Sequence, residues 1–315
     1  MKAETKKRHD ILKLVEISKL YYERHFTQAQ IGKAMQISRP LVSKLLAEAR
    51  DLGIVRIEIQ SPIQSNALLM DQLSINYNLQ GGLIVPTGTG KEKITQRVLI
   101  SQAALYIERL IPSMKFIGLG WGYTMGCLLD ELKPIKNEKK REGHVCPIVG
   151  IAPNDIKWFQ SNELTRIFAN KTGYTPHYLH APAFPMTMKN KKLFEDTEEY
   201  KETSGVWNKM DAIIVGAGIY PSVPDQATAV RFGNILKEKK AVGMIATYYY
   251  DEKGQFIEGP NDIVIRISLD SLRRTKVILI VGSGERRLNS VKGALMTGIV
   301  THLVSDEQTA KELVE

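Results

Sequence analysis

Three glycine-rich segments of this 315-residue chain contain the residue types that bind anions: residues 118–124 (GLGWGYT), 216–218 (GAG) and 282–287 (GSGERR). Each follows a short apolar run. Glycine lets a backbone turn sharply, and a helix that follows presents unpaired N–H groups with a partial positive charge. Tyr123 and Thr124 add hydroxyls, and Arg287 adds a guanidinium group suited to phosphate. A tight turn alone explains any one glycine cluster, but the three together predict a pocket for a phosphorylated small molecule.

The elements around these segments alternate between strand and helix. From residue 81 onward, short apolar runs such as GLIVP, KFIGLG and VILIVGSG precede helical patterns over residues 94–110, 124–132, 162–171, 225–236, 288–296 and 307–314. Repeated strand-then-helix order predicts an α/β fold with a parallel sheet covered on both faces. Such sheets bind ligands at the carboxyl ends of their strands. We therefore assign to one effector pocket the residues Gly120, Gly122, Tyr123, Thr124, Gly216, Gly218, Gly284, Glu285 and Arg287.

Residues 26–59 have the spacing of a helix-turn-helix followed by a wing strand at residues 54–59. Thr27 can cap a short helix through its hydroxyl. After a tight turn, Ser38 can cap a second helix that begins at Arg39, with Pro40 in its first turn, where a missing amide proton costs nothing. The apolar faces expected to pack inward consist of Ile31, Ala34 and Met35 in the first helix and Val42, Leu45, Leu46 and Ala49 in the second.

The second helix has a polar, basic face on the side opposite its apolar stripe. In helix-turn-helix proteins this helix enters the major groove with its N-terminal residues at base edges, so we expect Arg39 and Ser43 to read bases. Neighbouring side chains are expected to hold phosphates, which position the protein without specifying sequence. The predicted DNA-binding set is Gln28, Lys33, Ser38, Arg39, Ser43, Lys44 and Arg50. The alternative interpretation is an ordinary helical hairpin whose basic residues form a solvated face.

The distribution of charge favours DNA binding. Residues 1–60 hold 12 Lys and Arg against 7 Asp and Glu, a net charge of +5, while the whole chain carries +9. A positive field concentrated in under a fifth of the chain is what counterion release from DNA requires. The basic segment at residues 1–10 is expected to be a flexible tail that either adds phosphate contacts or has no role.

Length and composition predict a two-domain cytoplasmic protein. We expect a DNA-binding domain at residues 1–60, a linker helix within residues 61–80 and an effector-binding domain at residues 81–315. No apolar run reaches the roughly 18 residues that a membrane helix needs, so no membrane partner is expected. The charged N-terminus is unlike a secretory signal. Two lone cysteines, Cys127 and Cys146, are expected to be buried thiols.

The expected linker helix carries Leu69, Leu73 and Tyr77 at four-residue steps. A narrow apolar seam between two domains commonly pairs with its copy in a second chain, and a helix-turn-helix protein usually needs two copies to span two half-sites. The sequence therefore predicts a homo-oligomer, although the seam fits packing on its own domain equally well.

The remaining motifs do not support catalysis, a metal or a cofactor. Residues 87–91 (TGTGK) look like part of a phosphate loop, but Glu92 stands where Ser or Thr should hold magnesium. His177 and His180 have no carboxylate or cysteine nearby in the sequence, so no metal site is expected. No G-x-S-x-G motif occurs, and no nucleophile is paired with a general base at a recognisable spacing.

Several motifs occur along nearly the whole chain in a specific order. They are TQAQIGKAMQISRPLVSKLLAEARDLGIV, GLGWGYTM, DAIIVGAG, KKAVGMIATYYYDEKG, VGSGERRLNSVKGAL and HLVSDEQTAKELV. On these motifs the chain resembles the SorC/DeoR-type family of bacterial sugar-binding transcriptional regulators. The resemblance implies a winged helix-turn-helix joined to a larger Rossmann-like effector domain similar to glucosamine phosphate isomerases. It further implies a tetramer that releases or rearranges on DNA when a phosphorylated sugar binds.

By the same resemblance, residues 120–125 (GWGYTM) would cradle the phosphate of the effector. Arg287 stands where the family usually has a lysine, which keeps the charge but changes reach and geometry. Two further departures are Met244, in place of the aspartate of AVGDI, and Ala217, in place of the isoleucine of GIG. Without the carboxylate at position 244, the sequence does not say which sugar hydroxyl or other partner this position would contact. The segment VCPIVGIAPND looks closest to the sorbose-regulator branch.

The sequence thus predicts a DNA-binding regulator of a carbohydrate operon, switched by a sugar or phosphorylated sugar. The alternative from another class is a sugar-phosphate isomerase or deaminase with an accessory N-terminal domain. That enzyme would need a general base, and Asp225 and Glu285, near predicted strand ends, lack an evident partner. A third alternative, favoured by Met244, is a constitutive DNA-binding protein whose pocket has lost its ligand. The operator, the effector and the direction of regulation are left open.

Overall fold

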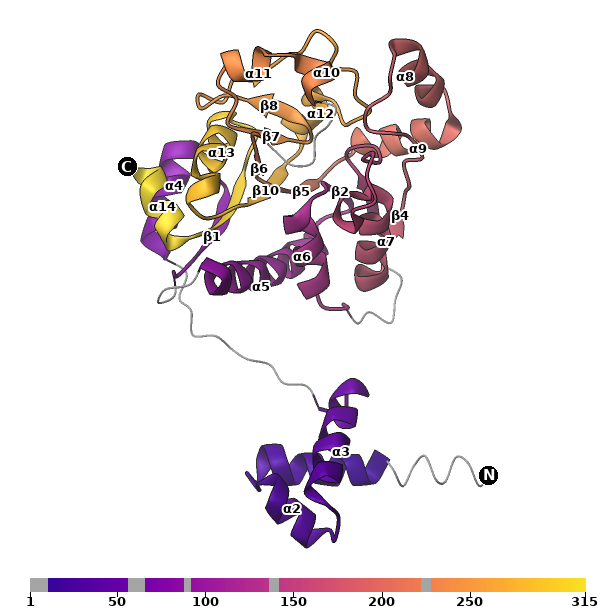
Figure 1. Cartoon of the computed structure of the whole chain (residues 1–315), viewed down its shortest axis with the longest axis vertical. Coiled ribbons are helices and arrows are strands. Elements are labelled where there is room, and N and C mark those ends of the chain that lie inside the picture. The colour runs from indigo at the N-terminus through magenta and orange to yellow at the C-terminus, as the bar shows by residue number, and fades with distance from the viewer. Residues whose placement is uncertain (1–10, 56–65, 88–91, 136–141, 222–227) are drawn as a thin grey trace. The chain divides into compact units, whose positions relative to one another are not determined.

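The structure is a computed structural model that describes residues 11–55, 66–87, 92–135, 142–221 and 228–315. The chain forms two compact units, Met1–Pro62 and Ile63–Glu315, which we call the N-terminal unit and the C-terminal unit (Figure 1). Four segments about which the sequence makes predictions lie outside the described residues: the basic tail at 1–10, most of the wing strand at 56–59, residues 88–91, and Asp225.

The N-terminal unit contains the predicted helix-turn-helix. Its helical segments are residues 11–18, continued by the π-helix η1 (Lys19–Glu23), then α2 (Gln28–Ala34) and α3 (Arg39–Asp51). Thr27 and Gln30 form a reciprocal capping box at the start of α2. The Ser38 hydroxyl accepts a hydrogen bond from the backbone N–H of Leu41, and Pro40 lies in the first turn of α3. The caps therefore place both helix starts where the sequence predicts them.

A small apolar core holds these helices together. Its buried side chains are Ile17, Ile31, Val42 and Leu46. Val42, Leu46 and Ala49 are buried as predicted, and Leu45 is half-buried. Ala34 is exposed, which corrects the predicted inward face of α2. Gly32 is buried instead, because the turn after α2 comes so close that a Cβ at this position would lie 2.8 Å from the carbonyl oxygen of Ile37.

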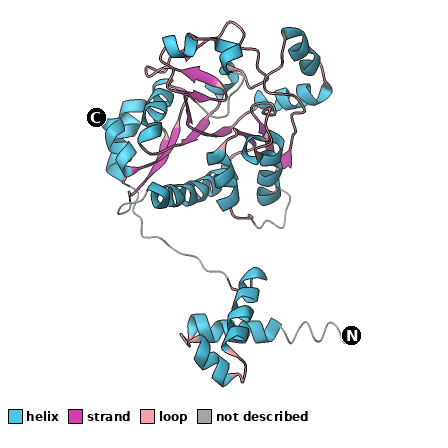
Figure 2. Ribbon diagram, viewed as in Figure 1, coloured by secondary structure: helices cyan, strands magenta, loops and turns pink. Residues whose placement is uncertain are grey.

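The C-terminal unit is built on a parallel sheet, which confirms the predicted α/β fold. Within the described residues, seven strands pair in the order β1-β11-β10-β5-β2-β3-β4, all of them parallel (Figure 2). The strands are β1 (Gly81–Val85), β2 (Phe116–Leu119), β3 (His144–Pro147), β4 (Thr175–Pro176), β5 (Ala212–Gly216), β10 (Val277–Val281) and β11 (His302–Asp306).

Helices cover both faces of this sheet. One face packs against α5 (Glu92–Leu110), α6 (Tyr123–Glu131) and α7 (Ser161–Thr172). The other face packs against α4 (Ala67–Tyr77), α9 (Glu198–Trp207), α12 (Leu269–Arg274), α13 (Glu285–Met296) and α14 (Glu307–Val314). The central strand β10 is buried throughout, and its successive side chains alternate between the two cores. Strands that are buried on both faces have continuous apolar sequences, and this is why these strands could be predicted from the sequence.

Some helices differ from the sequence prediction. The single helix expected at residues 225–236 is instead two short helices, α10 (Thr228–Phe232) and α11 (Ile235–Glu238), because Gly233 between them adopts a left-handed φ of 55°. The sequence also did not predict α8 (Met188–Glu195) and α9. None of the helices in the described ranges is both long enough and apolar enough to cross a bilayer.

A second, antiparallel sheet was not predicted from the sequence. Four short strands among the described residues pair in the order β6-β7-β8-β9: β6 (Gly218–Ile219), β7 (Gly243–Ile245), β8 (Tyr248–Tyr250) and β9 (Phe256–Ile257). Tyr249 and Ile257 of this sheet pack against Phe232 and Leu236 in one apolar cluster. Runs of two or three residues are too short for an alternating pattern to be recognised.

The expected linker helix, α4, packs on its own unit. Leu73 is fully buried in the core shared with the main sheet, and the Tyr77 hydroxyl donates a hydrogen bond to the carbonyl oxygen of Leu313 at 2.8 Å. Leu69, the third member of the predicted seam, is half-buried against the same core. The apolar seam of α4 therefore packs on its own domain, which is the second of the two alternatives that the sequence left open.

One buried and one half-buried histidine predict that the C-terminal unit loses stability in mild acid. Burial lowers the pKa of His302 in β11, and burial, with His177 and Lys209 nearby, lowers the pKa of His144. The unfolded chain therefore takes up protons first, at an ordinary pKa of about 6.5, and stability falls as the pH drops below that value. Urea unfolding between about pH 8 and about pH 5.5 should show this loss. His302→Gln should reduce it, and an unchanged pH dependence would contradict the assignment.

Candidate functional site

The three glycine-rich segments meet at one edge of the main sheet. β10, β5 and β2 are adjacent strands, and they end at Val281, Gly216 and Leu119. Residues 282–284 then lead into α13, and residues 120–122 lead into α6. Because parallel strands point their carboxyl ends the same way, these turns lie side by side at the edge where such sheets bind ligands.

The start of α6 offers free backbone amides to an anion. The residue before the helix, Gly122, has a left-handed φ of 111°, and no side chain in the described part of the chain caps the helix. The N–H of Gly122 itself donates to the carbonyl oxygen of Trp158 at 2.7 Å. The amides of Tyr123 and Thr124 remain, at the end of a nine-residue helix where the helix dipole is positive.

Arg287, in the first turn of α13, adds a fixed cation. Its Nη1 donates a hydrogen bond to the carbonyl oxygen of Ala217 at 2.6 Å, which holds the half-buried side chain over the end of β5. Burial and the neighbouring Arg286 lower the pKa of Arg287, and the group remains a cation at neutral pH. Within the described residues it forms no ion pair with a carboxylate. It therefore keeps N–H donors that a bound anion would satisfy.

Two cavities open on either side of these groups. The first, which we call the aromatic cavity, has a volume of about 200 Å³ and is walled by Trp121, Phe159, Phe184 and Met244, with Asn154 and Thr247 as polar members. The rings of Phe159 and Phe184 each lie 6.2 Å from that of Trp121, measured between centroids. Aromatic walls of this kind pack against the C–H faces of a small organic ligand.

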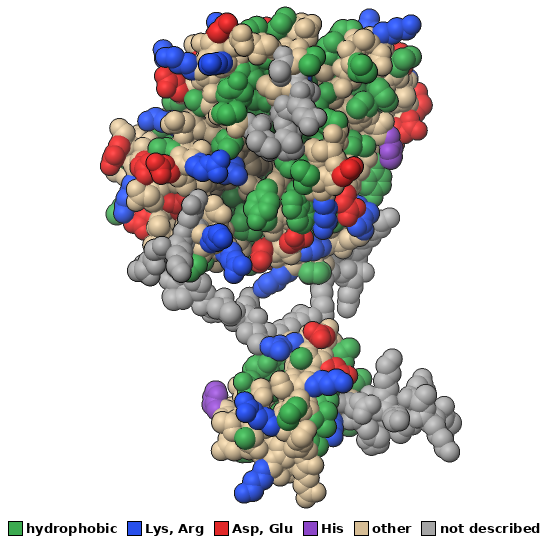
Figure 3. All heavy atoms as spheres, viewed as in Figure 1, with side chains coloured by type: hydrophobic (Ala, Val, Ile, Leu, Met, Phe, Trp, Pro, Cys, Tyr) green, Lys and Arg blue, Asp and Glu red, His purple; other side chains and the backbone are tan. Residues whose placement is uncertain are grey.

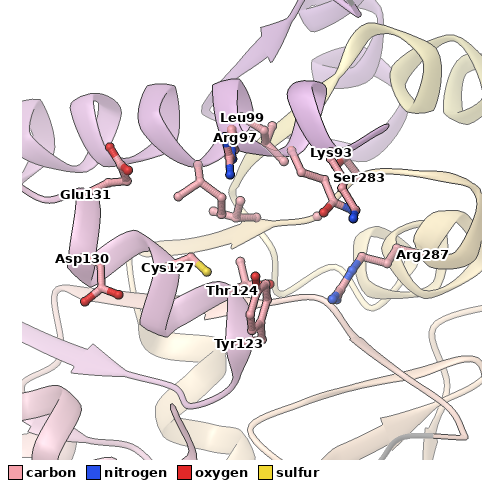
Figure 4. A pocket seen from close by; sticks show the side chains of 14 residues that line it. Lys93, Arg97, Leu99, Tyr123, Thr124, Cys127, Asp130, Glu131, Ser283 and Arg287 are labelled. Carbon is pink, nitrogen blue, oxygen red and sulfur yellow. The ribbon is translucent and has the colours of Figure 1, made fainter. Parts of the chain in front are cut away.

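The second, which we call the α5–α6 cavity, has a volume of about 440 Å³ and a mixed lining in which apolar side chains alternate with cations and with the carboxylates Asp130 and Glu131. Lys93 and Arg97 of α5 line it together with Cys127 of α6 and Ser283 (Figure 4). In this view Arg97 points into the space from one side, and Arg287 extends towards Tyr123 from the other.

Tyr123, Thr124 and Arg287 line both cavities. A hydrogen bond with the Cys127 thiol raises the pKa of the exposed Tyr123 hydroxyl, which therefore stays protonated at neutral pH. An anion held by the start of α6 and by Arg287 would lie at the junction of the two cavities.

The structure separates the predicted effector residues into two groups. Gly122, Tyr123, Thr124, Gly216, Gly218 and Arg287 line the aromatic cavity. Gly120, Gly284 and Glu285 line neither cavity. A Cβ at residue 120 would meet Val215 at 2.7 Å, so this glycine serves packing. The N–H of Gly284 already donates to the Thr309 hydroxyl, and the Glu285 side chain is exposed.

Sequence reasoning missed most of the cavity walls. Arg97 lies inside a predicted helix and Lys93 directly before it, where the pattern gives no sign of a site, and Phe184 and Thr247 come from distant segments. Cys127 is half-buried and lines the α5–α6 cavity, which corrects the expectation that both thiols are buried. Of the two histidines considered for a metal, His177 is bonded to His144 and Glu202, and His180 is exposed. The described residues contain no cluster suited to a metal ion.

In the N-terminal unit, the predicted DNA-binding side chains lie on the surface. Lys33, Arg39, Ser43, Lys44 and Arg50 are exposed, and Gln28 is half-buried. Figure 3 shows basic side chains spread over the visible face of this unit. Ser38 is exposed, but its hydroxyl is occupied with capping α3. The face that would enter a major groove is thus free of the core of its own unit.

A groove beside this face was not predicted from the sequence. It has a volume of about 630 Å³ and runs from Tyr21, Tyr22 and His25 to Gln28 and Arg39. It joins two predicted DNA contacts, one at the start of each helix of the motif. Aromatic and imidazole side chains next to a basic recognition helix are suited to contact the DNA backbone.

Comparison with known proteins gives matches over the whole chain. The model of a protein family described as "Putative sugar-binding domain" matches residues 61–315. The sorbitol operon regulator of Klebsiella pneumoniae is 26% identical over 313 residues, which are 97% of this chain and 98% of that protein. The deoxyribonucleoside regulator of Bacillus subtilis is 27% identical over 307 residues, which are 95% of this chain and 96% of that protein.

A solved structure agrees with these matches. The crystal structure of the full-length sorbitol operon regulator SorC from Klebsiella pneumoniae superposes with a TM-score of 0.75 at 26% identity, covering 97% of this chain and 99% of that one. The relatives that match along their full length are thus named as regulators, and the likeness extends over both units.

Proposed function

The chain belongs to the SorC/DeoR-type family of sugar-binding transcriptional regulators, and from this premise we propose that it controls a carbohydrate operon in response to a phosphorylated sugar. One observation supports the proposal more than any other. The same chain carries an exposed helix-turn-helix face and, in a separate compact unit, cavities that meet at a free helix start and a fixed arginine. The helix-turn-helix face is suited to binding DNA, and the cavities are suited to binding an anionic ligand.

In this proposal the phosphate lies between the amides of Tyr123 and Thr124 and the guanidinium group of Arg287. The sugar body lies in the aromatic cavity, where Trp121 and Phe184 cover its C–H faces. Among the relatives, one is named for sorbitol and another for deoxyribonucleosides. Sorbitol is a polyol and a deoxyribonucleoside contains a sugar, which agrees with a ligand of this class.

The ligand would act by shifting an equilibrium. A compound that binds one arrangement of subunits better than another favours that arrangement, and the spacing of the DNA-reading helices changes with it. This requires a homo-oligomer, a dimer or a tetramer, and we propose one. We also propose a cytoplasmic location, where the chromosome is accessible.

The sequence left open a second function, a sugar-phosphate isomerase or deaminase. The relatives are regulators and not enzymes, and Glu285, one of the two carboxylates considered as a base, lines neither cavity. Turnover of a sugar phosphate by the pure protein would reverse this conclusion.

The switch can be tested by fluorescence anisotropy with the DNA upstream of the protein's own gene. We expect at least one member of a panel of sugars and their phosphates to change the affinity for this DNA. If no compound changes it, the third alternative, a constitutive DNA-binding protein, is correct.

Arg39→Ala is expected to cost about 1 to 3 kcal/mol of specific DNA binding, because Arg39 lies in the first turn of the recognition helix and is exposed. Binding to random DNA should change much less. Anisotropy with the operator and with a scrambled duplex measures both.

Lys33→Ala is the matched control. Lys33 is also exposed, but it lies on α2, so its loss should weaken binding to both duplexes alike and lower the salt dependence by about one counterion. An equal loss on both duplexes for Arg39→Ala would instead make Arg39 a phosphate contact.

A further inference from the structure

A strained turn forms part of the wall of the aromatic cavity. Ala246 and Thr247 connect β7 to β8, and both adopt left-handed backbone conformations, with φ of 48° and 64°. A two-residue hairpin loop with both φ values positive normally uses Asn-Gly, because glycine and asparagine tolerate this region. For a β-branched residue such as threonine the conformation is a true outlier, which persists only where surrounding contacts enforce it.

Two arginines and one aspartate enforce it. Arg266 donates from Nη1 to both the carbonyl oxygen and the hydroxyl oxygen of Thr247, at 2.7 and 2.9 Å. Arg231 donates from Nη2 to the same carbonyl at 3.4 Å. Asp262 holds the two arginines in place, with contacts of 2.6 Å to Nη2 of each. We call these three residues the Arg231–Asp262–Arg266 cluster.

The cluster is largely shielded from solvent. The side chains of Arg231, Asp262 and Arg266 are 4%, 14% and 9% exposed. The guanidinium group of Arg266 lies 3.4 Å from the ring centroid of Tyr248, and that of Arg231 lies 4.5 Å from the ring of Phe184, a wall residue of the aromatic cavity. Charge-assisted hydrogen bonds between largely shielded groups are strong and directional, so the cluster holds the Thr247 turn in one geometry.

The Thr247 hydroxyl has a proton to donate. The residue is 3% exposed and lines the aromatic cavity. Its oxygen accepts from Arg266, so the hydroxyl hydrogen points away from that guanidinium group. A buried hydroxyl that already accepts a hydrogen bond still has its own hydrogen to donate, and Thr247 belongs to the wall of a cavity where a ligand could accept it.

We propose that the Thr247 hydroxyl donates a hydrogen bond to an oxygen on the carbon skeleton of the effector, and that the Arg231–Asp262–Arg266 cluster positions it for this contact. The inference rests on the proposed function, in which Arg287 and the start of α6 hold the phosphate and the aromatic cavity holds the sugar body. The effector class is then a sugar or polyol phosphate with a hydroxyl or carbonyl oxygen remote from the phosphate. Thr247 is a specificity-determining residue, and Arg266 is a positioning residue.

The first test compares Thr247→Val and Thr247→Ser in the full-length protein by isothermal titration. The probes are inorganic phosphate and the phosphates of glucose, fructose, sorbitol and deoxyribose. Valine keeps the shape and the β-branch but removes the donor, so affinity for the tightest-binding sugar phosphate should fall about tenfold. Serine keeps the donor and should bind like the wild type. Inorganic phosphate should bind all three proteins equally.

Thr203→Val is the matched control. Thr203 is also buried, and its hydroxyl donates to the carbonyl oxygen of Tyr178, but it lies on α9 and lines neither cavity. This variant tests whether the loss of any buried threonine hydroxyl in this unit weakens the binding of the sugar phosphate. An affinity loss for Thr203→Val equal to that for Thr247→Val would overturn the inference.

The second test is a double-mutant cycle with Arg266→Gln. If Arg266 acts through Thr247, its replacement should weaken sugar-phosphate binding in the wild-type background and have little further effect in Thr247→Val. A purely structural role would give additive losses and would overturn the positioning assignment.

The outcomes separate this inference from the proposed function. If no sugar phosphate binds the wild type, the proposed function fails and the inference fails with it. If sugar phosphates bind the wild type and Thr247→Val equally, the inference alone fails, and the proposed function stands.

Discussion

Replacing Arg287 with alanine is expected to weaken the binding of a phosphorylated sugar by about 2 to 3 kcal/mol, roughly 30- to 150-fold. The side chain lies at the junction of both cavities, and its hydrogen bond to the Ala217 carbonyl already fixes its position. Little ordering entropy therefore remains to be lost on binding. Isothermal titration with sugar phosphates measures the loss, and the concentration of sugar phosphate needed to change DNA anisotropy should rise by the same factor.

Two variants make this result specific. Arg286→Ala removes an exposed neighbour that lines neither cavity, so it should bind the ligand like the wild type. Arg287→Lys keeps the charge but not the planar pair of donors, and an intermediate affinity is expected. Equal affinities of Arg287→Ala and Arg286→Ala for the sugar phosphate would show that Arg287 does not bind the phosphate group.

Replacing Leu46 with alanine is expected to abolish DNA binding by unfolding most of the N-terminal unit. The loss of a buried leucine side chain costs about 2 to 5 kcal/mol. Leu46 is 3% exposed and is one of the four buried side chains of the core described for this unit. A domain of this size rarely holds more than about 3 to 5 kcal/mol of stability. Calorimetry should show loss of the transition that belongs to the N-terminal unit.

The effector site provides an internal control for this variant. Because the two units are separately compact, Leu46→Ala should bind sugar phosphate with wild-type affinity. Leu52→Ala, at the end of α3, removes a side chain that is 60% exposed and should retain DNA binding. Operator affinity close to that of the wild type for Leu46→Ala would show that the DNA-reading face does not depend on this core.

The helix-turn-helix could be predicted from the sequence because its signals are local. The Thr27 and Ser38 hydroxyls each bond an amide three residues away, and Pro40 restricts its own φ. Such contacts form within one turn of helix and do not depend on the rest of the fold. Ala34 was misassigned because the close approach of the turn at Ile37, and not helix periodicity, decides which side of α2 is buried.

The main sheet could be predicted for a related reason. Its central strands are covered on both faces, so each is an apolar run that no surface strand would tolerate. The strand order could not be predicted, and it is the order that places β10, β5 and β2 together. The glycine segments form one site only because these strands are neighbours.

The aromatic cavity had no local signal. Phe184 lies in a loop, Thr247 in a hairpin of very short strands, and Trp121 in a glycine-rich turn. The left-handed conformation of Thr247 runs against its own preference and depends on Arg231, Asp262 and Arg266. Local preference is overruled here by contacts between residues that are distant in sequence.

By itself, the sequence determined the two helices of the helix-turn-helix, the parallel α/β class and the presence of glycine-rich turns at strand ends, since each depends on residues within a few positions of one another. The tertiary structure decided which of those turns line a cavity, which cations of α5 join them, and that Thr247 belongs to the cavity wall. These depend on how strands and helices far apart in the chain pack, and packing energy is shared among contacts that no single segment contains.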